Sequence, residues 1–544
     1  MKKFNKIIVG SGSGGSVLAA RLSENENCEV LLLEAGPDFP EFDSTPNEIK
    51  YGYGIDENLW SRTFGVNSKF SWNYLGTAST ETDDMLIPRG RVIGGSSSVN
   101  AQIFLRGLPE DFDEWAKMGN NKWNASQTMP FFQKIENDLD YSGDFHNSEG
   151  PISVRRWNKS EWEKVQLAFY KASLSMGQPN CDDANDPNST GVGPLPFNNP
   201  EGIRWSTNFG YLSKVRHRMN LTIKANTLVR KIIFEGTKAI GVEIEAPAPL
   251  TYKNSTDTFH KKIEPKIYEI FCDEVILCAG AIETPHILML SGIGSTEKLR
   301  THGIEIIKNL PGVGKNLRDH PQIQVYWKTN KDLLQNNLSS RIQVGIRYTA
   351  SGSKLRNDMF IHPVGHAPES GIYLDSSSGS NGFGIVCALY LAMGSGEINL
   401  KSNDPHVQPD LNYNFMRDEF DLKRMREATR IAVKMGETDH LKGDIVTELI
   451  TPNRKILDND SLLNHWITKT SRTSHHVSGT CKMGVKEDNM SVVNQDGKIH
   501  HLKNIRIADA SIMPDCVRAN TNATTIVIGE RIAKSIINDD LRIE

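Results

Sequence analysis

The sequence predicts a protein of combined α/β and α+β class. A Rossmann-like dinucleotide-binding domain, discontinuous along the chain, is interleaved with a second domain built on an antiparallel sheet. Three observations predict this fold. A glycine-rich turn stands between an apolar strand and a helix near residue 10, residues from 220 onward alternate between apolar and polar, and the last 75 residues again carry site-like sequence. The 544 residues also exceed what one compact core usually holds.

The elements of the first domain follow each other in a regular order. Residues 6–9 and 29–34 are apolar enough for buried parallel strands, and residues 16–24 between them have helix character. The polar stretch 37–85 is expected to form a long irregular excursion. Helices are predicted over residues 109–117 and 125–136.

The alternating part of the chain predicts a second group of strands. Residues 221–224, 229–234 and 239–244 are expected to form an antiparallel meander, interrupted by a hairpin over 246–266 whose tip we expect to be disordered. Residues 274–280 form a buried strand that we place back in the first sheet. Further strands are expected near 322–328, 342–348 and 382–391, and an amphipathic helix near 416–436.

These elements suggest two interleaved domains. The nucleotide-binding domain is assigned residues 1–155, 215–315 and 471–544. The substrate-binding domain is assigned residues 156–214 and 316–470.

Composition excludes several functional classes. Hydrophobic residues make up 38% and charged residues 24%, as in an ordinary globular enzyme. The net charge is −4 and no long basic run occurs, which argues against a nucleic-acid partner. No apolar window is long enough for an integral membrane segment, and no secretory signal is visible. The 7 cysteines form no CxxC pair, so we expect reduced thiols in a cytoplasmic protein, with no metal site.

The N-terminal turn fits the dinucleotide fingerprint G-x-G-x-x-G, and its residues are Gly10, Gly12, Ser13, Gly14 and Gly15. The first glycine permits the tight turn, the second lets the backbone approach a pyrophosphate, and the last lets helix and strand pack closely. Glu34 ends the second strand, where an acid hydrogen-bonds the adenosine ribose. The motif alone does not distinguish FAD from NAD.

Further segments resemble the glucose–methanol–choline (GMC) oxidoreductase family, and the choline dehydrogenase-like branch most of all. These segments span almost the whole chain and are Pro88–Asn100, Gly280–Gly294, Asn316–His320, His476–Thr480, Asp509–Ser511 and Asn520–Thr524. The resemblance implies an FAD-dependent enzyme that oxidises a primary alcohol to an aldehyde by hydride transfer to flavin N5.

The resemblance also implies where the cofactor lies. The small residues 94–100 are expected along the flavin, with Asn100 bonded to it. Some members attach FAD through a histidine just before this asparagine, but here Val99 has no nucleophile, so we expect non-covalent FAD. The other residues expected to bind the cofactor are Arg91, Gly95, Ser96, Val229, Ala279, Asp509, Ala510 and Thr525.

A catalytic pair follows from the same resemblance. A base must remove the hydroxyl proton as hydride leaves, and histidine suits this role because its ordinary pKa is near neutrality. The motif places the base at His476 and its partner at Asn522. The adjacent His475 is expected to face away from the flavin, because neighbouring side chains of extended backbone point to opposite faces.

Several alternatives stay open at this point. A nicotinamide dehydrogenase shares the N-terminal fold, some GMC relatives are lyases or other redox-silent flavoproteins, and a non-catalytic flavin-binding module is a third possibility. The sequence leaves the alcohol open, choline included. It also leaves open the electron acceptor, which could be oxygen, a quinone or another carrier, and whether the chain forms a homodimer.

Overall fold

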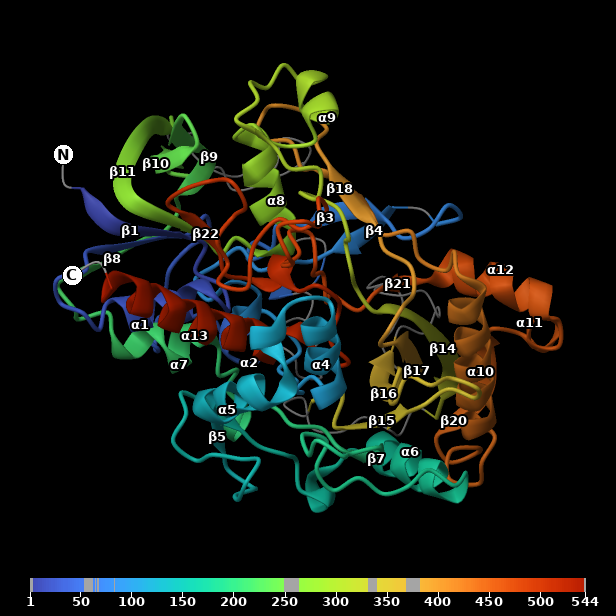
Figure 1. Cartoon of the computed structure of the whole chain (residues 1–544). Coiled ribbons are helices and arrows are strands. Elements are labelled where there is room, and N and C mark those ends of the chain that lie inside the picture. Colours follow the sequence, from blue (N-terminus) through green and yellow to red (C-terminus); the bar gives the residue numbers. More distant parts are fainter. Residues whose placement is uncertain are drawn as a thin grey trace.

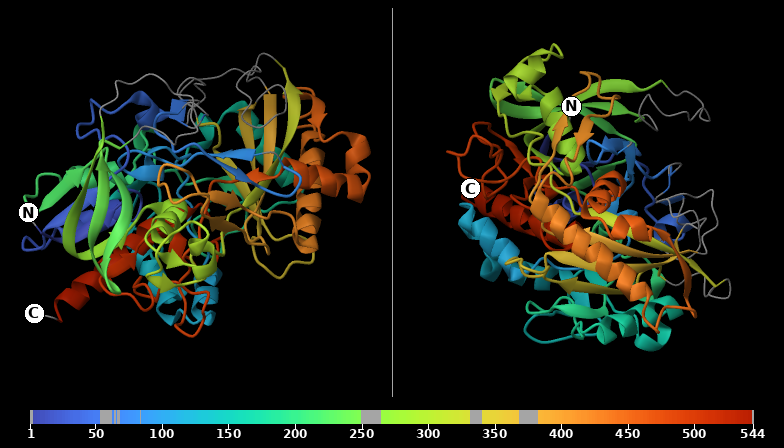
Figure 2. Two further views of the ribbon diagram at one scale, coloured as in Figure 1. Left: turned by 90° about the horizontal axis from the view of Figure 1, so that it is seen from above. Right: turned by 90° about the vertical axis from the view of Figure 1, so that its right-hand side faces the viewer.

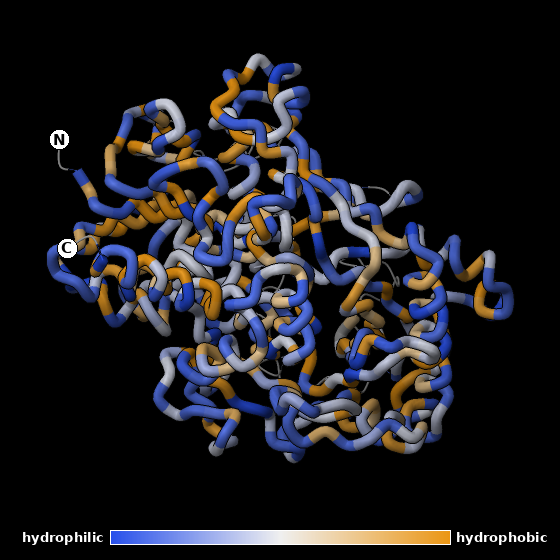
Figure 3. Tube along the Cα trace, in the orientation of Figure 1, coloured by the Kyte–Doolittle hydropathy of each residue, from blue (hydrophilic) through white to orange (hydrophobic). Residues whose placement is uncertain are grey.

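The computed structural model describes residues 3–52, 62–63, 65, 68–82, 84–248, 264–330, 340–367 and 382–542. Two large sheets dominate these residues. In Figure 1 the first lies around β1, β8 and β11, and the second around β14–β17. Figure 2 shows the two sheets from two further directions, with the C-terminal helix beside the first. In Figure 3 hydrophobic residues line the interior and the outer loops are largely hydrophilic.

The parallel part of the first sheet is assembled from distant segments. Its strands are β1 (Phe4–Val9), β2 (Val30–Leu33), β8 (Leu221–Lys224), β11 (Lys266–Leu277) and β22 (Ile505–Ile507). β1 lies between β2 and β11, β8 extends the sheet beyond β2, and β22 pairs with β11. Ile7 and Ile8 are fully buried, as expected for strands covered on both faces.

The predicted meander is correct in part. β9 (Leu228–Glu235), β10 (Lys238–Ala246) and the first half of β11 pair antiparallel. β8 does not belong to them, because it runs parallel to β2. Alternation of apolar and polar residues predicts a strand but carries no information about its partner or direction. Most of the hairpin 246–266 lies outside the described residues.

Two helices pack side by side against the first sheet. They are α1 (Gly15–Leu22) and α13 (Thr521–Asp540), which lie together in Figure 1. Seven of the eight α1 residues are buried. Arg21 of α1 pairs with the buried carboxylate of Glu530 on α13 at 2.8 Å.

The second sheet is antiparallel, in the order β20-β14-β17-β16-β15-β7. These strands are β20 (Val446–Thr451), β14 (Pro321–Thr329), β17 (Gly382–Leu389), β16 (Met359–Ala367), β15 (Val344–Tyr348) and β7 (Gly191–Pro194). They lie within the segments assigned to the substrate-binding domain, whose limits stay predictions. Helix α10 (Glu419–Gly436) packs on β17 and begins after Asp418, whose side chain accepts from Phe420 N.

The excursion 37–85 is more regular than we expected. β3 (Tyr74–Thr77) and β4 (Asp84–Ile87) form an antiparallel pair. β3 also pairs with β19 (Asp410–Asn412), which joins β18 (Glu397–Asn399). The excursion is therefore tied to the later half of the chain. Helices α4 (Pro109–Lys117) and α5 (Ala125–Ile135) match the predicted ranges closely.

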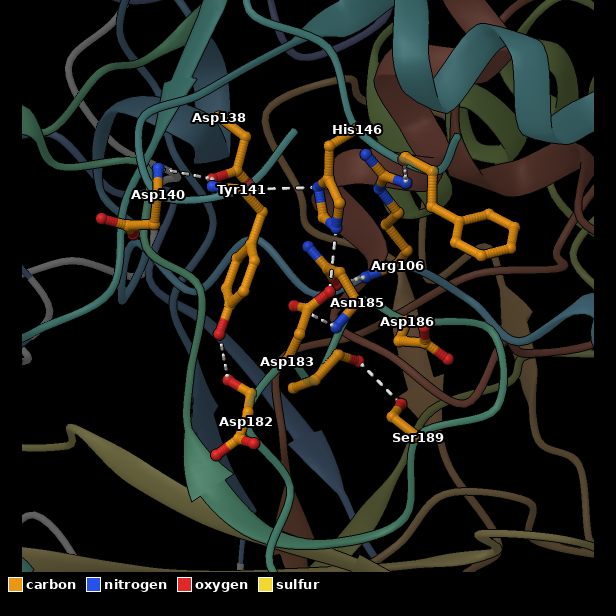
Figure 4. A network of polar contacts seen from close by, with 12 residues as sticks. Arg106, Asp138, Asp140, Tyr141, His146, Asp182, Asp183, Asn185, Asp186 and Ser189 are labelled. Atoms are coloured by element: carbon orange, nitrogen blue, oxygen red, sulfur yellow. Dashed lines mark hydrogen bonds and ion pairs between the residues drawn. The ribbon is translucent and has the colours of Figure 1, made fainter. Parts of the chain in front are cut away.

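A buried charge cluster lies beside these helices (Figure 4). His146 is hydrogen-bonded to Asp183 at 2.8 Å and lies 3.0 Å from Asp138 and 3.1 Å from Glu136. Arg106 pairs with Glu136, and Arg156 pairs with Asp138 and Asp183. We call these residues the charge cluster, which consists of Arg106, Glu136, Asp138, His146, Arg156 and Asp183.

The charge cluster has the spacing of a metal site but a balanced set of charges. Glu136, Asp138 and His146 present ligand atoms within 4.8 Å of one another. Although burial disfavours a charged ring, hydrogen bonds to Asp138, Asp183 and Glu136 raise the pKa of His146 to about 11. The protonated ring and two guanidinium groups thus oppose three carboxylates, so the cluster is neutral without an ion.

No helix among the described residues is both long and apolar enough to cross a membrane. All seven cysteines are free thiols.

Candidate functional site

One continuous cavity lies between the two sheets. Its lining begins at the glycine-rich turn after β1, passes the loop around Gly95 and ends on the face of β14, β16 and β17. The termini of the chain both contribute, because Gly10 and Thr525 line the same space. An elongated ligand with a charged end and a flat end would fit such a lining.

The glycine-rich turn has no room for side chains. Gly10 has φ +94°, and a Cβ atom there would lie 2.6 Å from the Cys278 carbonyl oxygen. A Cβ on Gly14 would lie 2.0 Å from the Ala508 oxygen, and one on Gly15 would lie 1.9 Å from the Gly10 oxygen. Gly10, Gly12, Ser13 and Gly14 line the cavity, whereas Gly15 packs α1 against β1, as predicted. The turn therefore offers backbone N–H groups at a helix N-terminus, which fits a pyrophosphate.

Glu34 stands where β2 ends and lines the cavity. Its Oε2 atom accepts from Ser11 N at 3.0 Å and Ser11 Oγ at 2.6 Å, and its Oε1 atom accepts from Gly36 N at 2.9 Å. Burial raises the pKa of this carboxyl. Oε2 already accepts two hydrogen bonds and Oε1 accepts one, so Oε1 is still able to accept from a ribose hydroxyl.

The loop of small residues packs backbone to backbone against the glycine turn. Gly95 has φ +53°, and a Cβ atom there would lie 2.7 Å from Gly12 Cα. Gly95, Ser96 and Asn100 line the cavity, as does the buried Val99. Such a surface, without side-chain bulk, suits a flat ring system.

Two arginines of this loop differ from expectation. Arg91 does not line the cavity: its guanidinium lies 4.8 Å from the Trp72 ring centroid and donates to the Ala35 carbonyl at 3.3 Å. Arg89 lines the cavity instead and donates to the His475 carbonyl at 2.7 Å. We predicted Arg91 as the cofactor-binding residue and assigned no role to Arg89, although both flank Gly90.

The remaining predicted cofactor residues all reach the cavity. They are Val229, Ala279, Asp509, Ala510 and Thr525. Asp509 also caps two helices, since Oδ2 accepts from Gly280 N at 2.9 Å and Oδ1 accepts from Ser511 N at 2.8 Å. Thr525 lies in the second turn of α13 and donates to the Thr521 carbonyl.

His476 stands at the centre of the cavity wall. Its Nδ1 atom lies 2.8 Å from His320 Nδ1, and its Nε2 atom lies 3.0 Å from Asn520 Nδ2. Burial, with His320, His475 and Arg89 nearby, lowers the pKa of His476 well below its ordinary value. The ring is therefore neutral at physiological pH and able to accept a proton.

The partner of His476 is Asn520, and the position we predicted, Asn522, is wrong for this contact. The Asn522 side chain points toward the glycine-rich turn before α1, where its Oδ1 atom accepts a hydrogen bond from Ser13 Oγ at 2.7 Å. Residues two apart at the start of a helix point in different directions. Asn520 precedes α13 and keeps extended backbone, which lets its amide reach His476.

The extended backbone that we expected at His475 is not present. His475 has φ +66°, so the backbone here is left-handed and not extended. Both His475 and His476 line the cavity. His476 is hydrogen-bonded to the Asn520 amide, and this contact marks it as the base.

Asp319 and His320 were recognised in the sequence as a motif without a role. The Asp319 Oδ1 atom accepts from His320 N at 2.7 Å and from His476 N at 3.0 Å. One carboxylate thus holds the backbone of both histidines. In the sequence, the one feature that could have indicated this role is the position of the Asp-His pair directly before a buried strand.

The far wall of the cavity is a face of the second sheet. Across β14, β17 and β16 the register aligns one row of Gln322, Ala388 and Phe360 and a second row of Gln324, Val386 and His362. All of these side chains line the cavity. Burial lowers the pKa of His362 to about 4, so this ring is neutral. Sequence patterning predicted β14 and β17 but missed β16, and it did not show which face of each strand looks toward the cofactor side.

Comparison with known proteins agrees with this site. The GMC oxidoreductase family models match residues 4–322 and 393–529. The oxygen-dependent choline dehydrogenase of Klebsiella pneumoniae subsp. pneumoniae is 32% identical over 98% of this chain and 96% of its own length. Oxygen-dependent choline dehydrogenase 1 of Chromohalobacter salexigens is 31% identical over 99% of this chain and 96% of its own.

The solved structures agree as well. Pyridoxine 4-oxidase from Mesorbium loti superposes with a TM-score of 0.86 at 26% identity, covering 98% of this chain and 99% of its own. The chain therefore belongs to the GMC oxidoreductase family and is an FAD-dependent oxidoreductase that acts on CH–OH groups.

Proposed function

We propose that this protein oxidises a primary alcohol to an aldehyde, with His476 as the base and Asn520 as its partner. The contact of 3.0 Å between His476 Nε2 and Asn520 Nδ2 in the cavity wall carries the proposal. FAD, bound without a covalent link, supplies the acceptor for the hydride that leaves the carbinol carbon. The glycine turn, Glu34 and the loop around Gly95 are the residues that would hold it.

The chain's own residues supply the proton chemistry. His476 Nε2 accepts the hydroxyl proton, and the Asn520 amide donates a hydrogen bond to the oxygen on which negative charge develops. An amide suits this position because it stabilises the alkoxide without competing for the proton. Asn522 instead accepts a hydrogen bond from Ser13, in the glycine-rich turn just before α1.

The substrate side of the cavity suits a neutral polar alcohol. Gln322, Gln324 and the neutral His362 offer hydrogen bonds, while Val386 and Ala388 offer an apolar floor. Among the described lining residues the carboxylates are Glu34, Glu283 and Asp509, and each is hydrogen-bonded on the cofactor side or to Tyr74. A quaternary ammonium group is best held by a carboxylate or aromatic cage. These strands present the Phe360 ring and two amides but no carboxylate among the described lining residues.

An anaerobic visible spectrum tests the proposal. Neutral primary alcohols, aliphatic and aromatic, should bleach the flavin band of the purified protein, and choline should do so at least about tenfold less efficiently. Admitting air then shows whether oxygen accepts the electrons. A flavin band that no alcohol bleaches would favour a lyase or other redox-silent activity, and choline as the best substrate would contradict the neutral-alcohol reading.

The pH dependence of flavin reduction follows from the base. The neutral form of His476 is the active form, and a lowered pKa keeps the ring neutral to more acidic pH. The reduction rate constant at saturating alcohol should therefore stay flat from about pH 8 down to about pH 6.5 and fall only below that. The groups that face the ring are His320, His475, His362 and Arg89, and all of them favour its neutral form. An acid limb above pH 7 in stopped-flow measurements would contradict the assignment.

Three properties stay proposals: oxygen as electron acceptor, a cytoplasmic location and a homodimer. Oxygen is supported by the similarity to the oxygen-dependent choline dehydrogenases described above. The nicotinamide alternative is disfavoured, because the flavin-facing loop and the C-terminal pair would then have no role.

A further inference from the structure

We propose that His320 is a positioning residue that fixes the tautomer of His476, so that the lone pair of His476 Nε2 faces the substrate. This inference rests on the proposed function, since it concerns the same base. Three contacts support it, and they lead from a backbone carbonyl through both imidazole rings to Asn520.

The first contact places one proton. His320 Nε2 lies 2.9 Å from the Val517 carbonyl oxygen. A carbonyl only accepts, so Nε2 must carry the hydrogen. The Cys516 sulfur, 3.1 Å from the same nitrogen, can then only accept as well.

The second contact transmits this choice to the base. Burial lowers the pKa of His320 to about 3, so the ring is neutral and its Nδ1 atom has no proton. His320 Nδ1 lies 2.8 Å from His476 Nδ1, and one hydrogen must lie between them. His476 Nδ1 is therefore the donor, and the neutral His476 ring keeps an unprotonated Nε2.

The third contact agrees with this result. His476 Nε2 lies 3.0 Å from Asn520 Nδ2, an amide nitrogen that donates and does not accept. In each of these three hydrogen bonds the donor is thus on the Asn520 side and the acceptor on the Val517 side. The atom left without a hydrogen of its own is His476 Nε2, whose lone pair accepts from Asn520 in this structure.

The His320 ring is also held rigidly. It stacks on Tyr390 with ring centroids 4.3 Å apart and an interplanar angle of 23°. Tyr390 in turn stacks on Phe360 at 4.8 Å. Asp319 ties the backbone of His320 and His476 to one carboxylate oxygen. The two rings therefore have little freedom to exchange roles.

Two matched variants separate a tautomer role from a packing role. His320→Phe keeps the aromatic stack on Tyr390 but removes both nitrogens, whereas His320→Gln can accept from His476 Nδ1 and donate to the Val517 carbonyl. With FAD content equal to wild type, His320→Phe should lower the rate constant of flavin reduction about 100-fold. His320→Gln should recover it to within about tenfold of wild type, and Cys516→Ala should leave it unchanged.

Two results would overturn the proposal. One is a His320→Phe variant as fast as wild type, and the other is a His320→Gln variant as slow as His320→Phe. If the variants fail to fold, neutron diffraction of the wild-type holoenzyme gives the answer directly. Deuterium is expected on His320 Nε2 and His476 Nδ1, and deuterium on His476 Nε2 instead would refute the inference. Full activity of a His476→Ala variant would refute the proposed function itself, which keeps the two failures distinct.

Discussion

Replacing His476 with alanine is expected to lower the rate constant of flavin reduction by an alcohol about 10³-fold, with FAD still bound. The loss follows from removal of the base, whose contribution in such reactions is typically two to four orders of magnitude. FAD should stay bound because the glycine turn and Glu34 lie at the other end of the cavity. Anaerobic stopped-flow absorbance measures both quantities in one experiment.

Neighbouring residues provide the controls for this prediction. His475→Ala removes a ring from the same cavity without touching Asn520, and its effect should be much smaller. Asn520→Ala should slow flavin reduction more than Asn522→Ala, because only Asn520 contacts the base. A larger loss at His475 would transfer the role of base to that residue.

Replacing Arg106 with methionine is expected to lower the free energy of unfolding by about 3–5 kcal/mol. The Arg106 and Glu136 side chains are 1% and 0% exposed, so the change leaves Glu136 with a buried charge and one cation fewer. Denaturant unfolding followed by tryptophan fluorescence measures the effect. Lys117→Met is the matched control: Lys117 pairs with Glu114 at the surface and is 71% exposed, so little or no change in the free energy of unfolding is expected.

The same charge cluster predicts how stability depends on pH. The pKa of His146 is raised from 6.5 to about 11 in the folded protein. A raised pKa contributes stability that is complete below pH 6.5 and is lost as pH rises toward 11. Arg106→Met removes a cation from beside the His146 ring and should widen this difference between the folded and the ordinary pKa of His146. Stability of Arg106→Met equal to that of Lys117→Met would contradict a contribution of the Arg106–Glu136 pair.

The local sequence pattern predicted most helices, strands and turns of this fold, because apolar runs and turn residues determine these structures through a few neighbouring positions. The glycine turn, Glu34 at the end of β2 and helix α4 lie where the sequence placed them. Pairing partners depend on residues hundreds of positions away, so alternation could not show that β8 joins β2 rather than β9. The two asparagines before and within α13 look alike in the sequence, and only the position where the helix begins separates them.

The charge cluster and the histidine chain were hidden for the same reason. Arg106 and Glu136 are 30 positions apart, and His320 and His476 are 156 apart, with no periodicity that links either pair. A buried arginine is recognisable only once its surroundings are known, because most arginines are exposed. The Asp319-His320 dipeptide marked a site, but its contacts with His476 required the fold.

The late position of β22 and α13 has a consequence for biogenesis. During synthesis the ribosome releases β1 and the glycine turn first, yet Gly14 packs against Ala508 and Ser13 is bonded to Asn522, nearly 500 residues later. The nascent chain must hold an unfinished sheet until its final segment emerges. Loading of the cofactor is therefore an event that follows translation, and apoprotein with a fully synthesised chain is the form that captures it.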